Sequence, residues 1–496
     1  MTVFSGKKTD LLGLFFLHNM INFNQAKKLF GMAKKSQMTK ESMTCNGSGL
    51  LFLFYGKILA KLFCKGKTSA NTPTIDYRES EEGFMRKKLL CKLTALALSV
   101  TMLGTLAGCG SGKDSGSGDS DTVKVGLLHS MSGSMAISEQ AVLDAEKLAI
   151  DEINKAGGVL GKKITYQEED GASDPSTFAT KAEKLVDQDG ITTVFGCWTS
   201  SSRKAVKSIF EDYSALLFYP VQYEGMESSS NIVYTGAAPN QQIVPAIDYL
   251  IEKGYKKFFL LGSDYVFPRT ANMIINAQVE NAGLEVVGEE YADMDQTDFA
   301  AIIAKIEEAK PDVIINTLNG TGNVSFFKQM SEKNYTSKDY MTMSFSIAEE
   351  EVATIGSDIL KGHMVSWNYY QTTETERNDE FVAAYKKAYG EDRVTSDPAE
   401  AAYDAVYLWA AACEKAGSFE VDDVLKTIES GEISYDAPEG TVTIDGGNHH
   451  LSKPVRIGEV KEDGLIYEVE STEAVKPDPY LESYDWAVKA GIKPLE

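Results

Sequence analysis

The sequence predicts an α/β fold of parallel sheets with helices on both faces. Short apolar runs that suit strands alternate along the chain with amphipathic segments that suit helices. The first pair shows the pattern, with an expected strand at 123–128 and an expected helix at 141–156 that ends at Gly157 and Gly158. Regular alternation of this kind favours parallel sheets, in which ligands bind beyond the carboxyl ends of the strands.

The other elements follow in order. Asp174 and Pro175 can open the second helix, because Asp caps helices and Pro suits the first helical position. Expected strands lie at 123–128, 164–167, 192–196, 215–219, 257–261, 284–288, 312–317 and 340–344. Expected helices lie at 141–156, 174–189, 201–213, 241–253, 270–281, 299–308 and 323–333.

An export signal is expected at residues 85–108. A basic start precedes an apolar run at 93–106, which is shorter than the roughly 20 residues of a membrane span. The junction Leu106-Ala107-Gly108-Cys109 resembles the lipobox of bacterial lipoproteins, which implies acylation of Cys109. A Gly/Ser-rich tether is expected at 109–121. The alternative is a buried apolar helix with a chance cysteine.

Residues 1–84 precede this signal, although an export signal normally begins a chain. We interpret them as a spurious or disordered extension, with translation starting at Met85. The alternative is a membrane-associating extension, because two short apolar stretches occur at 11–17 and 50–55.

The composition of residues 109–496 excludes several classes of function. Acidic residues outnumber basic ones by 66 to 33, which disfavours nucleic acid as a partner. Besides Cys109 only Cys197 and Cys413 remain, so at most one disulfide is possible, and whether they pair is open. No metal site or cofactor is expected, and the adjacent His449 and His450 are expected at a surface turn. No enzyme is expected either, because the Gly-x-Ser-x-Gly and Gly-x-Gly-x-x-Gly frames are missing.

The loops that follow the expected strands combine aromatic residues with neutral hydrogen-bonding groups. Such a lining suits a small polar ligand. The alternative is that the Ser and Asn residues cap helices and form turns, which would suffice for Ser201, Ser202 and Asn323. It does not explain why four large aromatic residues fall in these loops: Trp198, Tyr219, Tyr223 and Tyr265.

Several of these segments resemble the type I periplasmic binding proteins of the Leu/Ile/Val-binding family, and within it the urea- and short-chain-amide-binding branch. The resemblance spans about 123–492 and rests on residues 196–200, 218–225, 262–269, 344–351, 367–369 and 450–458. It implies two Rossmann-like α/β lobes joined by a three-segment hinge. The expected divisions are lobe one at 122–243, lobe two at 255–365, a returning segment of lobe one at 371–450, and a hinge-supporting tail at 451–496.

The resemblance also implies a function, namely the substrate-binding lipoprotein of an ABC importer for urea or a short-chain amide. Its partners would be that ligand and the permease and ATPase subunits, and it would be lipid-anchored outside the cytoplasmic membrane. The alternatives are a binding protein for branched-chain or other amino acids and a ligand-sensing receptor subunit. Urea suits the loops because it offers four N–H donors and one acceptor, and the loops 198–202 and 219–224 contain no arginine. The expected ligand-binding residues are Trp198, Ser200, Tyr219, Val221, Gln222, Tyr265, Asn319, Gly320 and Tyr369.

Overall fold

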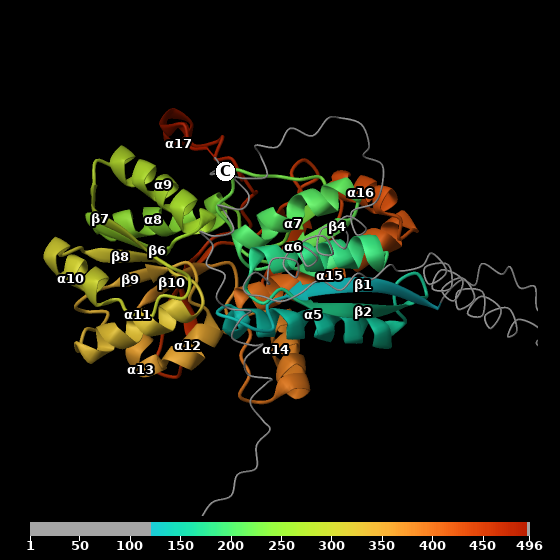
Figure 1. The fold of residues 1–496 in the computed structure, drawn as a ribbon, viewed down its shortest axis with the longest axis horizontal. Helices are drawn as coiled ribbons and strands as arrows, with labels where there is room; N and C mark the ends of the chain where they lie inside the picture. Colours follow the sequence, from blue (N-terminus) through green and yellow to red (C-terminus); the bar gives the residue numbers. More distant parts are fainter. Residues whose placement is uncertain (1–120, 494–496) are drawn as a thin grey trace, which may run out of the picture. The chain divides into compact units, whose positions relative to one another are not determined.

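The computed structural model describes residues 121–493 of the chain. The expected signal at 85–108, Cys109 and the tether up to residue 120 lie outside the described residues. The first sheet is wholly parallel, and its strand order is β2-β1-β3-β4-β5. Figure 1 labels β1, β2 and β4 of this sheet. Its strands are β1 (Thr122–His129), β2 (Lys163–Asp170), β3 (Thr193–Gly196), β4 (Leu216–Tyr219) and β5 (Ile232–Tyr234).

Helices pack on both faces of this sheet and form lobe one with it. One buried cluster joins β1 to the helices α5 and α15, and another lies between the sheet and the helices α6 and α7. The helices are α5 (Ala136–Ala156), α6 (Pro175–Glu183, continued by a π-helical turn at Lys184–Gln188), α7 (Ser200–Asp212), α14 (Glu376–Tyr389), α15 (Asp397–Ala416) and α16 (Val421–Glu429). A small antiparallel sheet completes the lobe with β11 (Ser434–Ala437), β12 (Gly440–Ile444) and β13 (Leu451–Ser452).

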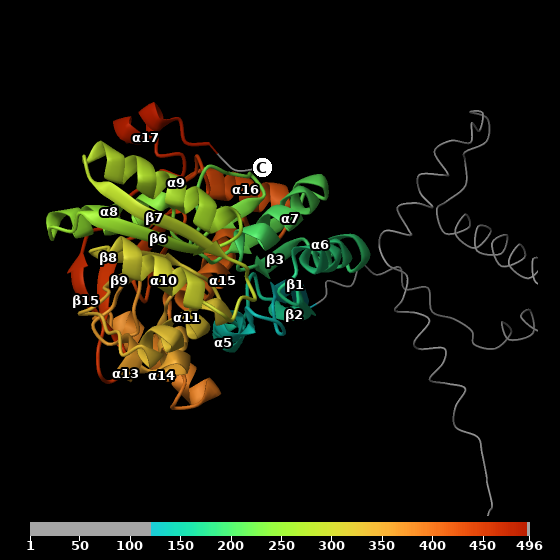
Figure 2. The same ribbon diagram turned by 60° about the vertical axis from the view of Figure 1, so that its left-hand side comes forward.

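The second sheet has the order β15-β14-β10-β9-β8-β6-β7 and forms lobe two (Figure 2). Its central strands are parallel, whereas the last two strands of the chain add antiparallel to one edge. The strands are β6 (Lys257–Ser263), β7 (Glu285–Ala292), β8 (Val313–Thr317), β9 (Thr342–Ser344), β10 (Met364–Trp367), β14 (Arg456–Val460) and β15 (Ile466–Ser471). The helices are α8 (Ile243–Glu252), α9 (Val266–Asn281), α10 (Ala300–Ala309), α11 (Thr321–Glu332), α12 (Glu349–Ile355), α13 (Ser357–Leu360) and α17 (Asp485–Ala490).

The structure confirms the predicted α/β class with parallel sheets. Most elements lie within a few residues of their expected positions. The helix α9 begins four residues earlier than expected, because Pro268 falls in its first turn, where the missing N–H costs no helical hydrogen bond. The strand β5 was not expected. No helix within 121–493 has both the length and the apolar character that a membrane crossing requires.

Three connections link the elements of the two lobes, at 235–242, 368–375 and 453–455. The side chain of Asn368, in the second connection, donates to the Gln241 carbonyl at 3.0 Å and to the Pro454 carbonyl at 2.6 Å, which belong to the other two. The backbone N–H of Asn368 donates to Asp397 at 2.8 Å, at the start of α15. One buried residue therefore joins all three connections to lobe one.

Two expectations about single residues are settled by burial. Cys197 and Cys413 are both free thiols in buried positions. His449 and His450 are buried as well, so their expected place at a surface turn was wrong. The ring of His450 stacks on Tyr234 with a centroid separation of 4.2 Å, which explains why an imidazole is buried here.

Candidate functional site

The lobe-one part of the candidate site lies at the carboxyl ends of β3 and β4. Cys197 follows β3 with a positive φ of 65°, and this turn leads to Trp198. The hydroxyl of Tyr219, at the end of β4, donates to the Trp198 carbonyl at 2.5 Å. Burial raises the pKa of Tyr219, so its hydroxyl stays protonated at neutral pH. The structure thus joins two predicted site residues, Trp198 and Tyr219, through a buried hydrogen bond.

The helix α7 starts beside this pair and carries a buried cation that the sequence analysis missed. Arg203 is fully buried, with its guanidinium 5.0 Å from the ring centre of Tyr219 and 4.5 Å from that of Tyr223. Its Nη2 donates to Glu224 at 3.0 Å and its Nε to Glu227 at 2.9 Å. Burial favours a high pKa for Glu227, but Arg203 outweighs it and lowers that pKa to about 2. The cation is therefore fully paired with two carboxylates.

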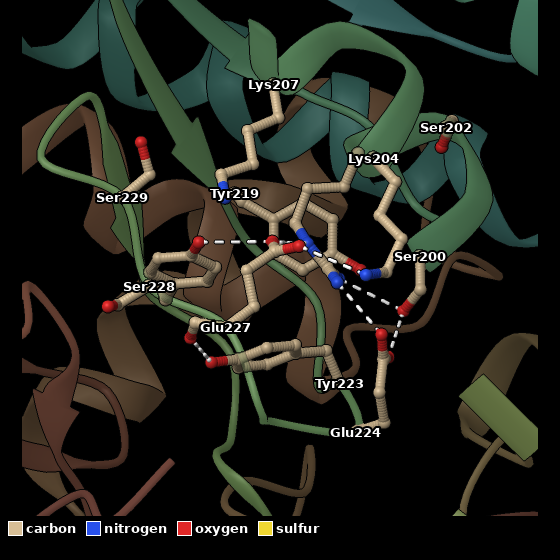
Figure 3. Close-up of polar contacts among 12 residues, drawn as sticks. Ser200, Ser202, Lys204, Lys207, Tyr219, Tyr223, Glu224, Glu227, Ser228 and Ser229 are labelled. Carbon is tan, nitrogen blue, oxygen red and sulfur yellow. Dashed lines mark hydrogen bonds and ion pairs between the residues drawn. The ribbon is translucent and has the colours of Figure 1, made fainter. Parts of the chain in front are cut away.

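Ser200 lies three residues before Arg203, on the same side of α7. Its hydroxyl donates to Glu224 and accepts a hydrogen bond from Arg203 Nη1 at 3.0 Å (Figure 3). Thr199, not Ser201 or Ser202, caps α7, because its side chain accepts the backbone N–H of Ser202. The Ser200 hydroxyl is therefore not needed to cap α7.

Lobe two approaches this region through several contacts. Gln222, two residues before Glu224, donates through its amide nitrogen to the Phe345 carbonyl at 2.8 Å, and Phe345 follows β9. The helix α7 of lobe one packs against α9 of lobe two. Gly320, which precedes α11, has a φ of 57°, and a Cβ there would lie 2.6 Å from the Ser134 carbonyl of lobe one. The lobes are closed on each other at these points.

Tyr265 is a lobe-two residue that lies close to Tyr219 and Glu224 of lobe one. It occupies the N-cap position of α9 and is partly buried. Burial, and then the neighbouring Tyr219 and Glu224, raise the pKa of Tyr265, while the nearby Asn319 side chain lowers it. The backbone N–H of Asn319 donates to Ser263 Oγ at 3.1 Å. Predicted residues of both lobes therefore meet at one place.

The remaining expected residues lie in less direct positions. Val221 is buried in the same cluster as Tyr219. Tyr369 packs in the core of lobe one, and its hydroxyl already bonds Asn378 at 2.6 Å and Thr395 at 2.8 Å, which leaves it little capacity to bind a ligand.

The polar groups of two further residues near these loops have partners within the protein. Tyr223 is buried, and its hydroxyl bonds the Glu227 carbonyl and His450 Nε2. Arg269, after Tyr265, forms an exposed ion pair with Asp264 at 2.6 Å.

A second contact between the lobes involves three carboxyl groups in the first turn of α12. Glu351 accepts a hydrogen bond from Ser138 of α5 at 2.6 Å, and Glu350 accepts one from Ser396 at 2.8 Å. Glu349 accepts the backbone N–H of Gln371 at 2.9 Å. Burial, and then Glu351, raise the pKa of Glu350 to about 8. These groups hold α12 against lobe one.

A buried acidic cluster in lobe one could in principle hold a metal ion. Carboxylate oxygens of Glu400, Asp404 and Glu439 lie within 4.8 Å of one another. The Lys453 ammonium, itself fully buried, lies 3.1 Å from Glu439, so a cation of the protein already balances part of this charge. Burial raises the pKa of Glu400 and Asp404 well above normal, which favours protonated carboxyl groups over a metal site.

Comparison with known proteins places this fold among binding proteins. A family model described as "Periplasmic binding protein domain" matches residues 123–485. A Leu/Ile/Val-binding protein homolog of Brucella abortus (strain 2308) is 24% identical over 375 residues, which cover 70% of this chain and 90% of that protein. This family and its structural neighbours bind substrates and are not enzymes.

Two solved structures show the same fold. A solute-binding protein of an ABC transporter from Rhodopseudomonas palustris HaA2, in complex with p-hydroxybenzoic acid, superposes with a TM-score of 0.66 at 24% identity, covering 73% of this chain and all of that one. A leucine-binding protein of Thermotoga maritima gives a TM-score of 0.62 at 18% identity, covering 71% of this chain and 99% of that one. At these identities the similarity concerns the fold.

Proposed function

The chain belongs to the periplasmic binding protein family, and we propose that it is the substrate-binding protein of an ABC importer that encloses urea or a short-chain amide between its lobes. The ligand-binding residues proposed are Trp198, Ser200, Tyr219, Val221, Gln222, Tyr265, Asn319 and Gly320. The protein would deliver the ligand to permease and ATPase subunits and would be anchored outside the cytoplasmic membrane through Cys109.

The observation that supports this ligand class best is an unpaired acceptor at the lobe contact. Gln222 is 3% exposed, and its Oε1 has no hydrogen-bond partner within the described residues. The orientation of this amide follows from chemistry, because the other end donates to a carbonyl and must be the nitrogen. Ser346, next to Phe345, is also buried, and its hydroxyl oxygen has no partner in the part of the chain that the structure describes. Such groups cost roughly 1–3 kcal/mol each when unpaired, and N–H donors of a ligand would satisfy them.

The charges near the site also favour a neutral ligand. A carboxylate ligand, such as a benzoate or an amino acid, normally requires a cation or several backbone donors. Arg203 is a buried cation at this site, and Glu224 and Glu227 already neutralise it. Urea and small amides need no such cation, since they carry no charge.

Calorimetric titration of the purified protein tests the proposal directly. Urea, acetamide and formamide should bind, with leucine and 4-hydroxybenzoate as comparison ligands. If leucine binds well and the amides do not, the ligand class is wrong and the protein is an amino-acid binder. Binding of 4-hydroxybenzoate alone would equally exclude the amide proposal.

A further inference from the structure

Ser200 is held by two charged partners that leave it only one way to contact a ligand. A serine hydroxyl has one hydrogen to donate and two lone pairs that accept. Glu224 takes the hydrogen, because the carboxylate paired with Arg203 can only accept. Arg203 fills one lone pair, because a guanidinium can only donate. One lone pair of Ser200 remains for a ligand.

We infer that Glu224 and Arg203 are positioning residues that make Ser200 an acceptor only, so that the site selects ligands with an N–H at this point. This inference rests on the proposed function and names its specificity: the ligand places a neutral or cationic N–H donor, and not a carboxylate oxygen, against Ser200. A carboxylate oxygen in the same place would meet an acceptor, with the Glu224 carboxylate directly behind it.

The surrounding contacts hold Arg203 and Glu224 in place, so the directions of their hydrogen bonds with Ser200 stay the same. Arg203 is fixed at both ends, with Nε on Glu227 at 2.9 Å and Nη2 on Glu224 at 3.0 Å, and it lies between two tyrosine rings. It cannot turn towards an anion without leaving two buried carboxylates unpaired, which is costly. Glu224 is 1% exposed and Ser200 is 2% exposed, so water cannot readily replace either partner.

The test is a double-mutant cycle between Glu224→Gln and Ser200→Ala, read as the ratio of acetate to acetamide dissociation constants. In Glu224→Gln the new amide can donate to Ser200, which frees the serine hydrogen for a ligand. The ratio should therefore fall by about 5- to 150-fold in the Ser200 background, the range expected for one buried hydrogen bond. In the Ser200→Ala background the same substitution should change the ratio much less.

Glu211→Gln is the matched control, because it removes a carboxylate from the same helix whose partners are Lys207 and Ser229, and it leaves the contacts of Ser200 and Arg203 in place. It should keep the ratio of the wild type. The inference is wrong if Glu224→Gln leaves the ratio unchanged. It is also wrong if the ratio shifts equally with the wild-type serine and in the Ser200→Ala background, since that result indicates a general charge effect. Should Glu224→Gln not fold, Ser200→Ala alone must weaken acetamide binding at least fivefold without weakening acetate binding.

Failure of the proposed function would appear differently. The wild type would then bind neither acetamide nor urea. If it binds leucine instead, the same cycle applies with leucine and 4-methylpentanoate, which lacks the ammonium group. The inference holds if Glu224→Gln reduces the preference for leucine with the wild-type serine but not in the Ser200→Ala background. It is overturned if Glu224→Gln changes this preference equally in both backgrounds.

Discussion

Removing the Tyr265 hydroxyl should weaken ligand binding while the fold is preserved. The Tyr265 hydroxyl lies close to Tyr219 and Glu224 of lobe one, and a tyrosine hydroxyl can donate its hydrogen to a ligand carbonyl. Tyr265→Phe removes this donor and keeps the ring, which packs 6.3 Å from Phe267. The loss of one buried hydrogen bond should cost about 1–3 kcal/mol, or roughly a 5- to 150-fold higher Kd for urea.

Calorimetry with urea measures this change, and thermal unfolding checks the fold. Tyr335→Phe is the control in the same lobe, because its hydroxyl bonds Glu307 of α10 at 2.8 Å. The control should bind urea like the wild type. A Tyr265→Phe variant that is folded and binds urea with unchanged affinity would refute the assignment of Tyr265.

Small-angle scattering should show a smaller radius of gyration with saturating urea, because contacts from both lobes favour the closed state; an unchanged radius would contradict hinge closure. Glu350 of α12 bonds Ser396 of lobe one, and burial there raises its pKa from 4.5 to about 8, so we expect closure of the lobes to take up a proton. Urea affinity should therefore fall as the pH rises from 4.5 to about 8, and Glu350→Gln should flatten this pH profile. Asn368→Ala removes two buried hydrogen bonds and should lower the free energy of unfolding by about 2–4 kcal/mol in denaturant titration, whereas a change below about 0.5 kcal/mol would speak against its role. Mass analysis of the native protein should find an acylated Cys109 as its N-terminus, and an unmodified start at Met1 would exclude that processing.

The fold could be predicted because each strand and helix has a local pattern of its own. Runs of apolar residues bounded by turns mark β1, β3, β4, β6 and β8, and all of them lie within a few residues of their expected positions. Three residues make only a weak pattern, and of the two strands of that length within 121–493 β9 was expected whereas β5 was missed. The burial of His450 was missed because its partners, Tyr223 and Tyr234, are more than 200 residues away.

The candidate site could be predicted only as far as its loops. Trp198, Tyr219 and Tyr265 stand out because large aromatic residues seldom gather in strand-following loops by chance. Arg203 was missed because it lies one residue beyond the loop considered, yet its spacing of three from Ser200 on a helix would have placed both on one face. Pairing of Arg203 with Glu224 and Glu227 depends on tertiary contacts, which local patterns do not contain.

The side chain of Asn368 has a mechanical consequence for the protein. Because its one amide group bonds the other two connections, the three connections cannot bend independently. We therefore expect the lobes to move by rotation about a common axis instead of by sliding or splaying. A transporter that recognises the closed form would then meet one reproducible geometry, whichever small ligand had caused the closure.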